Sequence, residues 1–437
     1  MTTTLTRRGF LVGVAGGALA AASARRVLGA NDRISIGLLG CGGRSLGHLH
    51  MAYQSAADMN AEITAVCDLW SVHRERAAGY VEKAFGGKPR AFQYHEDLLA
   101  LQDLDAVMIA TGDFQHAKLL VDVVRAGKDC YCEKPMANVL EEAKLARDTV
   151  VGSKQVVQMG SQWVSDPWQN AVRDIVRSGQ LGRITRIAQT WNKNEERWHH
   201  DDNPNVKRIR EEDTDWKRWL LGKPDRPFDP WAYFEFRVHK DFSSGIPDQW
   251  MSHGSGLVHF YMDEDIPETM VANGGIYQWP EMRENPDTFS AVATYKKGFS
   301  HVYQTQFGNS FGSFSAIMGT QGTLWSEGGE GSQVWTLTPK GGLPSDDRPR
   351  PGLIPVAEER RIVVPGQPEP LMEPSDDSKQ HYDDWITSMR ARKQPNGDIY
   401  TGFKHSVAVI MAARAYREGK KLYWDPVSEQ ILDHPPA

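Results

Sequence analysis

The sequence has few cysteines, and their spacing argues against a metal site or a disulfide framework. Its four cysteines are Cys41, Cys67, Cys130 and Cys132, and no two of them form a CxxC pair. Cys130 and Cys132 are two residues apart on one predicted strand, too far to be bridged without distorting it. We therefore expect buried, reduced thiols and no metal.

Long hydrophobic runs and an excess of basic charge are also missing. No stretch after the N-terminal region approaches the roughly 20 apolar residues of a spanning helix, so we expect no membrane span. The chain has 50 basic and 56 acidic residues and a formal net charge of −6, and residues 1–30 hold four of the arginines but no acid. This balance argues against nucleic acid and anionic membranes as partners.

The N-terminus carries a pattern typical of an export signal. Arg7 and Arg8 precede an apolar run over residues 10–22 that ends in small residues. Twin arginines before a modest apolar run mark the route that exports folded proteins. An uncleaved anchor is the alternative, but the run is short and interrupted by glycines. We expect residues 1–30 to be a twin-arginine signal peptide and the protein to be periplasmic or extracellular.

The rest of the chain is long enough for two domains. Residues 31–160 alternate short apolar strands with helices, which predicts a doubly wound parallel sheet of the Rossmann type. In residues 161–437 the predicted strands follow one another closely, which favours a C-terminal α/β domain with a large, mostly antiparallel open sheet. We expect a Pro-rich excursion at 340–376 and closing helices near 378–392 and 404–418.

A glycine-rich turn stands between the first predicted strand and the first helix. Gly40, Gly42 and Gly43 permit a tight turn and a close approach of the backbone to a pyrophosphate at the helix N-terminus. Ser45 replaces the third glycine of GxGxxG, so the prediction of a dinucleotide site depends on the strand–turn–helix context.

The end of the second strand bears on the choice of dinucleotide. Asp68 can accept hydrogen bonds from ribose hydroxyls and would repel a 2′-phosphate, which favours NAD. Capping of the following helix is the alternative role for Asp68. Arg74 and Arg76 leave NADP open.

Several motifs together resemble the Gfo/Idh/MocA oxidoreductases. They are the glycine loop with Arg44, the run 109–117 (IATGDFQHA), the run 126–135 (AGKDCYCEKP) and the end of the chain at 412–426. The resemblance implies a Rossmann domain followed by an α/β domain whose open sheet holds a sugar and often an oligomer interface. A homo-oligomer formed through the C-terminal sheet is therefore expected.

The resemblance also implies the catalytic residues. Lys134 of Glu-Lys-Pro would lie between nicotinamide and the substrate hydroxyl, and His253 is the acid/base candidate of the second motif. That motif is Asp-x-x-x-His in many members, but Gln249 stands here where the acid is expected, and Asp248 is one residue off. His259, six residues after His253, is assigned to packing.

The remaining site residues fall into two groups. The expected cofactor site comprises Gly40, Gly42, Gly43, Arg44, Asp68, Thr111, His116, Glu133 and Lys134. The expected substrate site comprises Gln162, Trp163 and Gln249. His116 has helix capping as an equal alternative. The run His199-His200-Asp201-Asp202 lacks metal-ligand spacing and predicts a solvated loop.

Three functions follow from these residues. The leading one is an NAD(P)-dependent oxidoreductase that acts on a secondary hydroxyl of a sugar or polyol. Because free NAD is scarce outside the cytoplasm, we expect the cofactor to be retained and recycled by a second sugar. The alternative is an NAD-dependent glycoside hydrolase that uses transient oxidation and elimination. The third is a catalytically silent sugar-binding protein, which the replacement by Gln249 leaves open.

Overall fold

The computed structural model describes residues 32–194, 204–280, 283–328, 335–339, 360–362 and 379–436 of the 437-residue chain. The predicted signal peptide, the His199–Asp202 run and most of the predicted excursion at 340–376 lie outside these residues. No helix in the described part of the chain combines the length and apolarity needed to cross a membrane.

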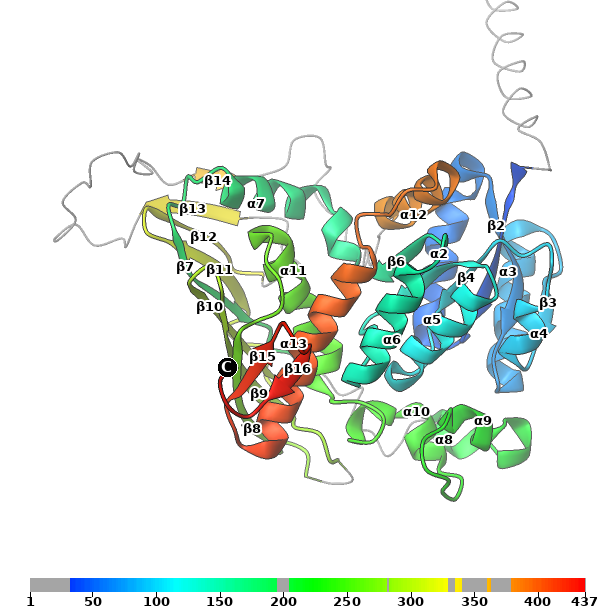
Figure 1. Cartoon of the computed structure of the whole chain (residues 1–437). Helices are drawn as coiled ribbons and strands as arrows, with labels where there is room; N and C mark the ends of the chain where they lie inside the picture. Colours follow the sequence, from blue (N-terminus) through cyan, green and yellow to red (C-terminus); the bar gives the residue numbers. More distant parts are fainter. Residues whose placement is uncertain are drawn as a thin grey trace, which may run out of the picture.

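The first domain is a six-stranded parallel sheet with helices on both faces, as predicted (Figure 1). Its strand order, β3-β2-β1-β4-β5-β6, is that of a doubly wound sheet whose order reverses between β1 and β4. Its elements are β1 (Ile34–Leu39), α2 (Gly43–Met59), β2 (Ala61–Cys67), α3 (Ser71–Phe85), β3 (Arg90–Phe92), α4 (His95–Leu99), β4 (Ala106–Ile109), η2 (Asp113–Gln115), α5 (His116–Arg125), β5 (Asp129–Glu133), α6 (Leu140–Val151) and β6 (Val157–Gly160).

One helix from the end of the chain completes this domain. Helix α12 (Lys379–Ala391) packs against α2, and its Tyr382 and Trp385 are fully buried with side chains of β1 and β2. The first domain therefore includes a helix from beyond the predicted domain boundary at residue 160.

The second domain contains a ten-stranded sheet, of the mostly antiparallel kind expected from the sequence. Its order is β14-β13-β12-β11-β7-β10-β9-β8-β15-β16, and β7 and β10 form its parallel pair. The strands are β7 (Ile184–Thr190), β8 (Thr269–Gly275), β9 (Thr288–Tyr295), β10 (Phe299–Gln306), β11 (Phe314–Gly319), β12 (Gly322–Ser326), β13 (Trp335–Pro339), β14 (Arg360–Ile362), β15 (Leu422–Asp425) and β16 (Gln430–Leu432).

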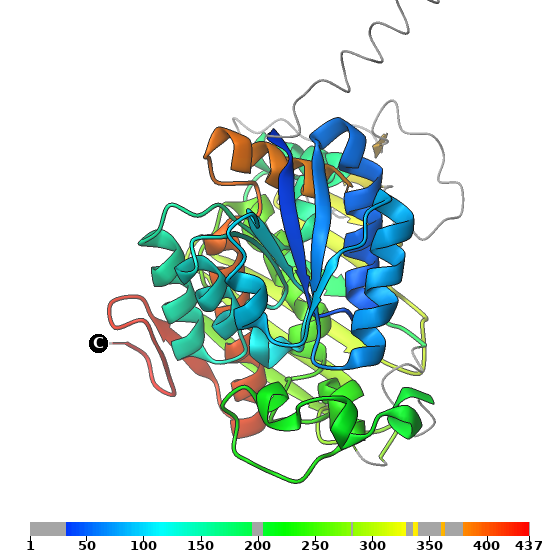
Figure 2. The same ribbon diagram turned by 90° about the vertical axis from the view of Figure 1, so that its right-hand side faces the viewer.

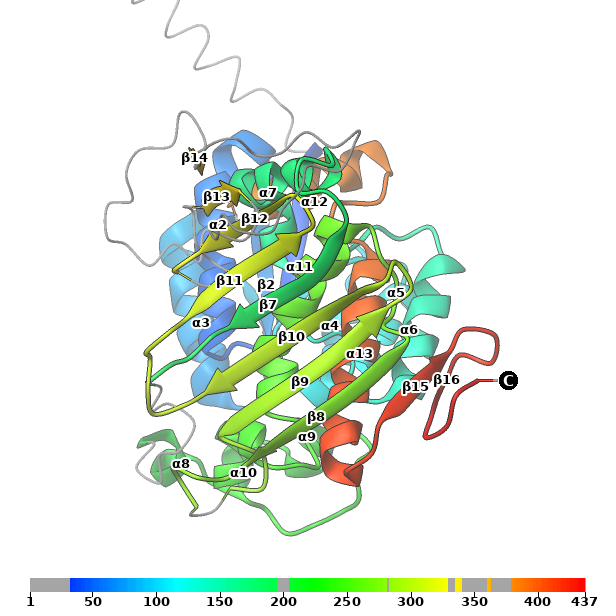
Figure 3. The ribbon, with the colours of Figure 1, turned by 90° about the vertical axis from the view of Figure 1, so that its left-hand side faces the viewer.

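Helices cover one face of this sheet. The covering helices α11 and α13 contact each other, and α13 contacts β8. Along β9 buried and more exposed side chains alternate, which is the pattern of a strand with one covered face. Figure 3 views the other face, which no described helix crosses. The helices of this domain are η3 (Gln162–Ser165), α7 (Pro167–Arg177), η6 (Pro247–Met251), α11 (Ser252–Met262) and α13 (Ile399–Glu418). Helix α13 begins five residues before the predicted start at 404, because Asp398 caps it by accepting from the Thr401 N–H at 3.0 Å.

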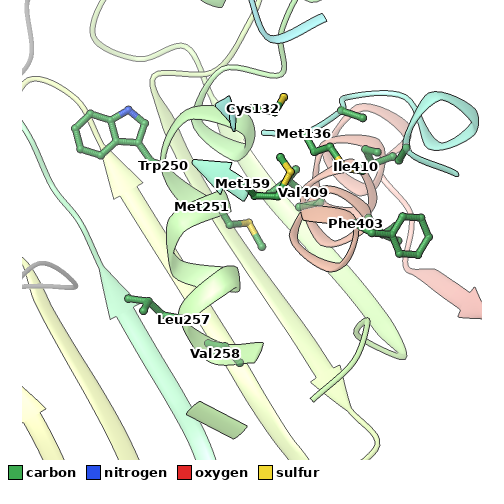
Figure 4. Packing of buried hydrophobic residues seen from close by; sticks show 14 of the residues in the cluster. Cys132, Met136, Met159, Trp250, Met251, Leu257, Val258, Phe403, Val409 and Ile410 are labelled. Atoms are coloured by element: carbon green, nitrogen blue, oxygen red, sulfur yellow. The ribbon is translucent and has the colours of Figure 1, made fainter. Parts of the chain in front are cut away.

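The two domains share a hydrophobic core directly behind the strand ends β5 and β6. Figure 4 shows Met136 and Met159 from the first domain beside Val409 and Ile410 of α13, with Met251 of η6 close by. Residues that follow β5 are thereby held against η6, which is the geometry that a site between the domains needs.

A long connection between β7 and η6 leaves the second domain and lies against the first (Figures 1 and 2). Its described part, residues 204–242, is here called the covering segment. It contains α8 (Pro204–Arg208), η4 (Glu211–Asp213), α9 (Trp216–Leu220), α10 (Pro230–Phe234) and η5 (Phe236–Val238). Several of its aromatic side chains are buried in one cluster with Trp70 and Phe114 of the first domain.

Candidate cofactor and catalytic site

The glycine loop has the conformation that its sequence predicts. Gly40 has a φ of +86°, and a Cβ there would lie 2.7 Å from the Ala110 carbonyl oxygen, so only glycine fits. At Gly42 the nearest atom to an added Cβ is His73 Cε1 at 4.0 Å, and at Gly43 nothing lies within 4 Å. Both glycines line a cleft at the carboxyl ends of β1, β2 and β4.

This cleft fits a dinucleotide pyrophosphate. Helix α2 opens into it with no side-chain cap and no acidic residue in its first turn, so backbone N–H groups face the cleft. Thr111 also lines it, and its buried hydroxyl has no hydrogen-bond partner among the described residues. The open space at Gly42 and Gly43 leaves room for the phosphates to approach the backbone.

Asp68 lines the same cleft but is already engaged with backbone N–H groups. Its carboxylate accepts from the Cys41 N–H at 2.6 Å and from the Trp70 N–H at 2.9 Å. It therefore orders the glycine loop and the residue before α3 while remaining at the cleft, but it does not cap α3, whose N-cap is Trp70. Arg74 and Arg76 each donate one hydrogen bond to a backbone carbonyl oxygen, that of Asp68 at 2.6 Å and that of Cys41 at 2.8 Å.

Glu133 is the centre of a buried polar cluster. One oxygen of its carboxylate accepts from Arg44 at 2.7 Å and Gln162 at 2.9 Å, and lies 2.8 Å from His48 Nε2. Burial alone would raise the pKa of Glu133, but Arg44 and His48 hold it well below its usual range. Gln162, which we expected at the substrate, is instead buried and also donates to the Tyr131 hydroxyl at 2.8 Å. The amide thus supports Glu133, and a contact of Gln162 with substrate stays a prediction.

His116 links two loops of the site. Its ring nitrogens lie 2.8 Å from the Pro135 carbonyl oxygen and 3.3 Å from that of Thr111. The buried ring therefore connects the turn after β4 to the turn after β5, which carries Lys134. The ring thus holds these two turns in position, and the expected contact of His116 with the cofactor stays a prediction.

Lys134 follows β5 and points toward the second domain. Its Nζ donates to the backbone carbonyl oxygen of Gln249 in η6. Burial lowers the pKa of Lys134 to about 8, against the opposing charges of Glu133 and Asp113. An amine with this pKa can give and take a proton near neutral pH.

A π-helical turn lies where the Asp-x-x-x-His motif is offset by one residue. Residues 247–251 form this turn immediately before α11, and a π turn holds one residue more than an α turn. The Asp248 carboxylate accepts from the Ser244 N–H at 2.6 Å. In the described part of the chain, it makes no hydrogen bond to His253. Burial and the nearby Asp113 charge raise the pKa of Asp248 to about 6.

Asp113 supplies a carboxylate that sequence reasoning missed. It accepts from the side-chain amide of Gln249 and from the Ser243 hydroxyl, the latter at 2.7 Å. Gln249 Oε1 in turn accepts from Arg237 Nε at 2.9 Å. The Gln249 side chain is thus fixed by two charged partners, and its backbone by Lys134. The available signal was the position of Asp113 in the 109–117 run, directly after a buried strand.

His253 lies in an aromatic setting. Its ring centroid is 4.6 Å from that of Trp163 and 6.0 Å from that of Trp191. Burial, and then the Lys134 charge, hold the pKa of His253 well below its usual range, so its imidazole is neutral at pH 7. The site thus brings together two predicted catalytic residues and Trp163, whose ring suits the apolar face of a sugar.

Other predictions fall outside this site. All four cysteines are free and buried, as expected. His259 packs in the core with its Nε2 3.1 Å from the Tyr295 hydroxyl, also as expected. Within the described ranges no group of three or more His, Cys, Asp or Glu residues is arranged to hold a metal ion.

Residues 34–161 match the GFO_IDH_MocA family model, described as an oxidoreductase family with an NAD-binding Rossmann fold. This match supports the Gfo/Idh/MocA resemblance and confirms that the first domain is of the NAD-binding kind. Inositol 2-dehydrogenase of Rubrobacter xylanophilus is 30% identical over 38% of this chain and 46% of its own length. Glycosyl hydrolase family 109 protein 2 of Shewanella sp. (strain ANA-3) is 28% identical over 53% of this chain and 45% of its own length.

The solved structure of levoglucosan dehydrogenase in complex with NADH has a TM-score of 0.68 to this chain. The alignment covers 89% of this chain and 98% of the levoglucosan dehydrogenase chain, at 15% identity. At this identity the likeness shows the fold alone. The match to inositol 2-dehydrogenase spans less than half of that protein's length.

Proposed function

We propose that this protein is an NAD-dependent oxidoreductase that acts on a secondary hydroxyl of a sugar or polyol. The observation that carries the proposal is the contact of Lys134, which follows β5 of the nucleotide-binding sheet, with the Gln249 backbone in η6, four residues before His253, whose ring packs on Trp163. When bound, NAD supplies the hydride acceptor at this place. Lys134, or His253, takes the hydroxyl proton, and the tryptophan face orients the ring.

The pH dependence of oxidation tests the role of Lys134. A proton acceptor must be neutral, and the pKa of Lys134 is about 8. The rate of substrate oxidation should therefore fall about tenfold for each pH unit below 8 and be level above it. Carbonyl reduction needs the protonated amine, so its rate should fall above pH 8. Stopped-flow absorbance of reduced nicotinamide measures both directions, and a flat oxidation profile between pH 6 and 8 would exclude Lys134 as the acceptor.

The alternative is a glycoside hydrolase that uses bound NAD transiently, and the match to a family 109 glycosyl hydrolase favours it. The same proton-transfer groups would serve both reactions. Cleavage of an aryl glycoside with no net change in bound NAD would support the hydrolase, whereas accumulation of an oxidised sugar would support the oxidoreductase.

We further propose export by the twin-arginine route with NAD already bound. The Arg7-Arg8 pair before the apolar run supports this. Replacing both arginines with lysine should leave the protein in the cytoplasm, because lysines conserve charge but not the twin-arginine pattern. Cell fractionation with immunodetection measures the distribution, and periplasmic delivery equal to wild type would refute the proposal.

The proposal includes a homo-oligomer formed through the open face of the C-terminal sheet. The absence of a described helix on that face supports it (Figure 3). Val271 and Val292 are among its exposed apolar side chains.

A further inference from the structure

The nucleotide cleft has a second wall that comes from the other domain. Alongside the glycine loop, the cleft is lined by Arg218, Trp219, Tyr233, Phe234 and Arg237 of the covering segment. We infer that the covering segment (residues 204–242) is part of the NAD site and that NAD can leave only when this segment detaches from the first domain. The inference rests on the proposed function, since it takes NAD to be the ligand of the cleft.

One end of the covering segment is fixed beside Asp68. The Phe234 ring centroid is 5.1 Å from that of Trp70 and 5.9 Å from that of His73, both in edge contacts. Trp70 and His73 lie just after β2, where the ribose of the adenosine half belongs in a sheet of this order. Phe234 therefore covers this end of the cleft.

The middle of the segment is held by hydrogen bonds to the loop and helix after β4. Gln115 donates its side-chain amide to the Trp219 carbonyl oxygen at 2.6 Å, and Lys118 Nζ donates to that of Leu221 at 3.0 Å. The Phe114 ring packs at 5.0 Å from the Trp219 ring. Gln115 and Trp219 both line the cleft, so this attachment bridges it.

Three residues after Phe234, the segment also contacts Gln249 of η6. Arg237 lines the cleft, and its Nε donates to the Gln249 side chain at 2.9 Å, while the Gln249 backbone accepts from Lys134. The segment thus contacts the residues beside Asp68 through Phe234 and, through Arg237, the Gln249 side chain, whose backbone accepts from Lys134. Loss of one attachment between the covering segment and the first domain should therefore loosen the segment. The groups that face the phosphates should stay in place.

The aromatic packing inside the segment makes it one unit. The Trp219 ring stacks on Trp216 at 4.8 Å and on Tyr233 at 5.2 Å, with interplanar angles of 12° and 24°. A segment packed in this way detaches as a whole, so any one of its attachments affects access along the entire cleft.

Release of NAD from the full-length protein tests the inference. Protein loaded with NAD⁺ is freed of excess by gel filtration and chased with fluorescent etheno-NAD⁺. We expect Phe234→Ala and Lys118→Met to release NAD at least tenfold faster than wild type. Phe311→Ala, at a residue 86% exposed and away from the cleft, should release NAD at the wild-type rate.

A matched control isolates the bond to Leu221. Lys118 also lies 3.2 Å from the Glu142 carboxylate. Glu142→Gln removes this ion pair and keeps the attachment, so its release rate should equal that of wild type. Equal release rates in wild type, Phe234→Ala and Lys118→Met would overturn the inference.

Limited proteolysis gives a readout that does not depend on release. Lys217 and Arg218 are exposed trypsin sites in α9. Saturating NAD⁺ should slow cleavage after these residues several-fold, as followed by mass spectrometry, and an unchanged cleavage rate with NAD⁺ bound would overturn the inference. If wild type binds no NAD⁺ at millimolar concentration, the proposed function itself fails, and the inference with it.

Discussion

Replacing Lys134 with methionine should lower turnover about 10²-fold or more, the scale expected for loss of a proton-transfer group. Lys134 is the titratable group at the end of β5 that reaches across to η6, and burial lowers its pKa to about 8. Methionine matches the side chain as far as Cε but has no amine to accept a proton. NAD should remain bound, because the glycine loop and the N-terminus of α2 are untouched.

Lys134→Arg provides the sharper comparison. Arginine keeps a charged donor for the Gln249 carbonyl oxygen but does not lose its proton at any pH used for proteins. We expect Lys134→Arg to fold and to bind NAD, yet to be about as slow as Lys134→Met. His253→Ala, with Lys134 in place, should retain the fall in rate below pH 8.

Rates are compared under conditions where chemistry is limiting, as judged by a deuterium isotope effect on the substrate carbon. Wild-type turnover in Lys134→Arg under these conditions would assign the proton to another group. No turnover by wild type with any sugar or glycoside, despite bound NAD, would instead favour a silent sugar-binding protein.

The sequence predicted the first domain well because its signals are local. Strands such as β1 and β4 are short apolar runs, and the turn from β1 to α2 carries its own glycines. The association of α12 with this domain could not be predicted in the same way. Its Tyr382 and Trp385 have the pattern of any half-buried helix, and only the tertiary structure decides which sheet they cover.

The sequence predicted the two candidate catalytic residues, Lys134 and His253, but not the side chains that surround them. Their environment depends on Asp113, which lies 136 residues before its partner Gln249 in the sequence. The second motif begins in a π-helical turn, which periodicity alone does not reveal. An acid at 249 would have faced the Asp113 carboxylate, so glutamine at this position is consistent with an acid supplied from the first domain.

Gln162 and Trp163 show how a backbone turn separates neighbouring side chains. Gln162 and Trp163 are neighbours, and both are plausible sugar contacts by residue type. In the 3₁₀ turn η3 they diverge, so that Gln162 bonds to Glu133 while the Trp163 ring meets His253. Which of two adjacent polar and aromatic residues reaches a substrate depends on the backbone turn between them.

Gly42→Val should give a folded protein that has lost NAD. An added Cβ at Gly42 comes no closer than 4.0 Å to any atom, so the fold has room for the side chain. The valine methyl groups would instead fill the cleft where the pyrophosphate approaches the N–H groups of α2. Loss of two charge-assisted hydrogen bonds, at about 1.5–3 kcal/mol each, corresponds to NAD affinity weakened about 10²-fold or more.

The same substitution elsewhere controls for changes in the fold. Gly79→Val lies in α3, where an added Cβ also meets nothing within 4 Å, but Gly79 does not line the cleft. Both variants should unfold near the wild-type temperature, and only Gly42→Val should lack the nicotinamide mass and absorbance after purification. Gly40→Val would not serve, because its positive φ and the Ala110 carbonyl oxygen at 2.7 Å make the fold itself fail. If Gly42→Val retained NAD at wild-type occupancy, the pyrophosphate would bind elsewhere, and the assignment of the glycine loop would be wrong.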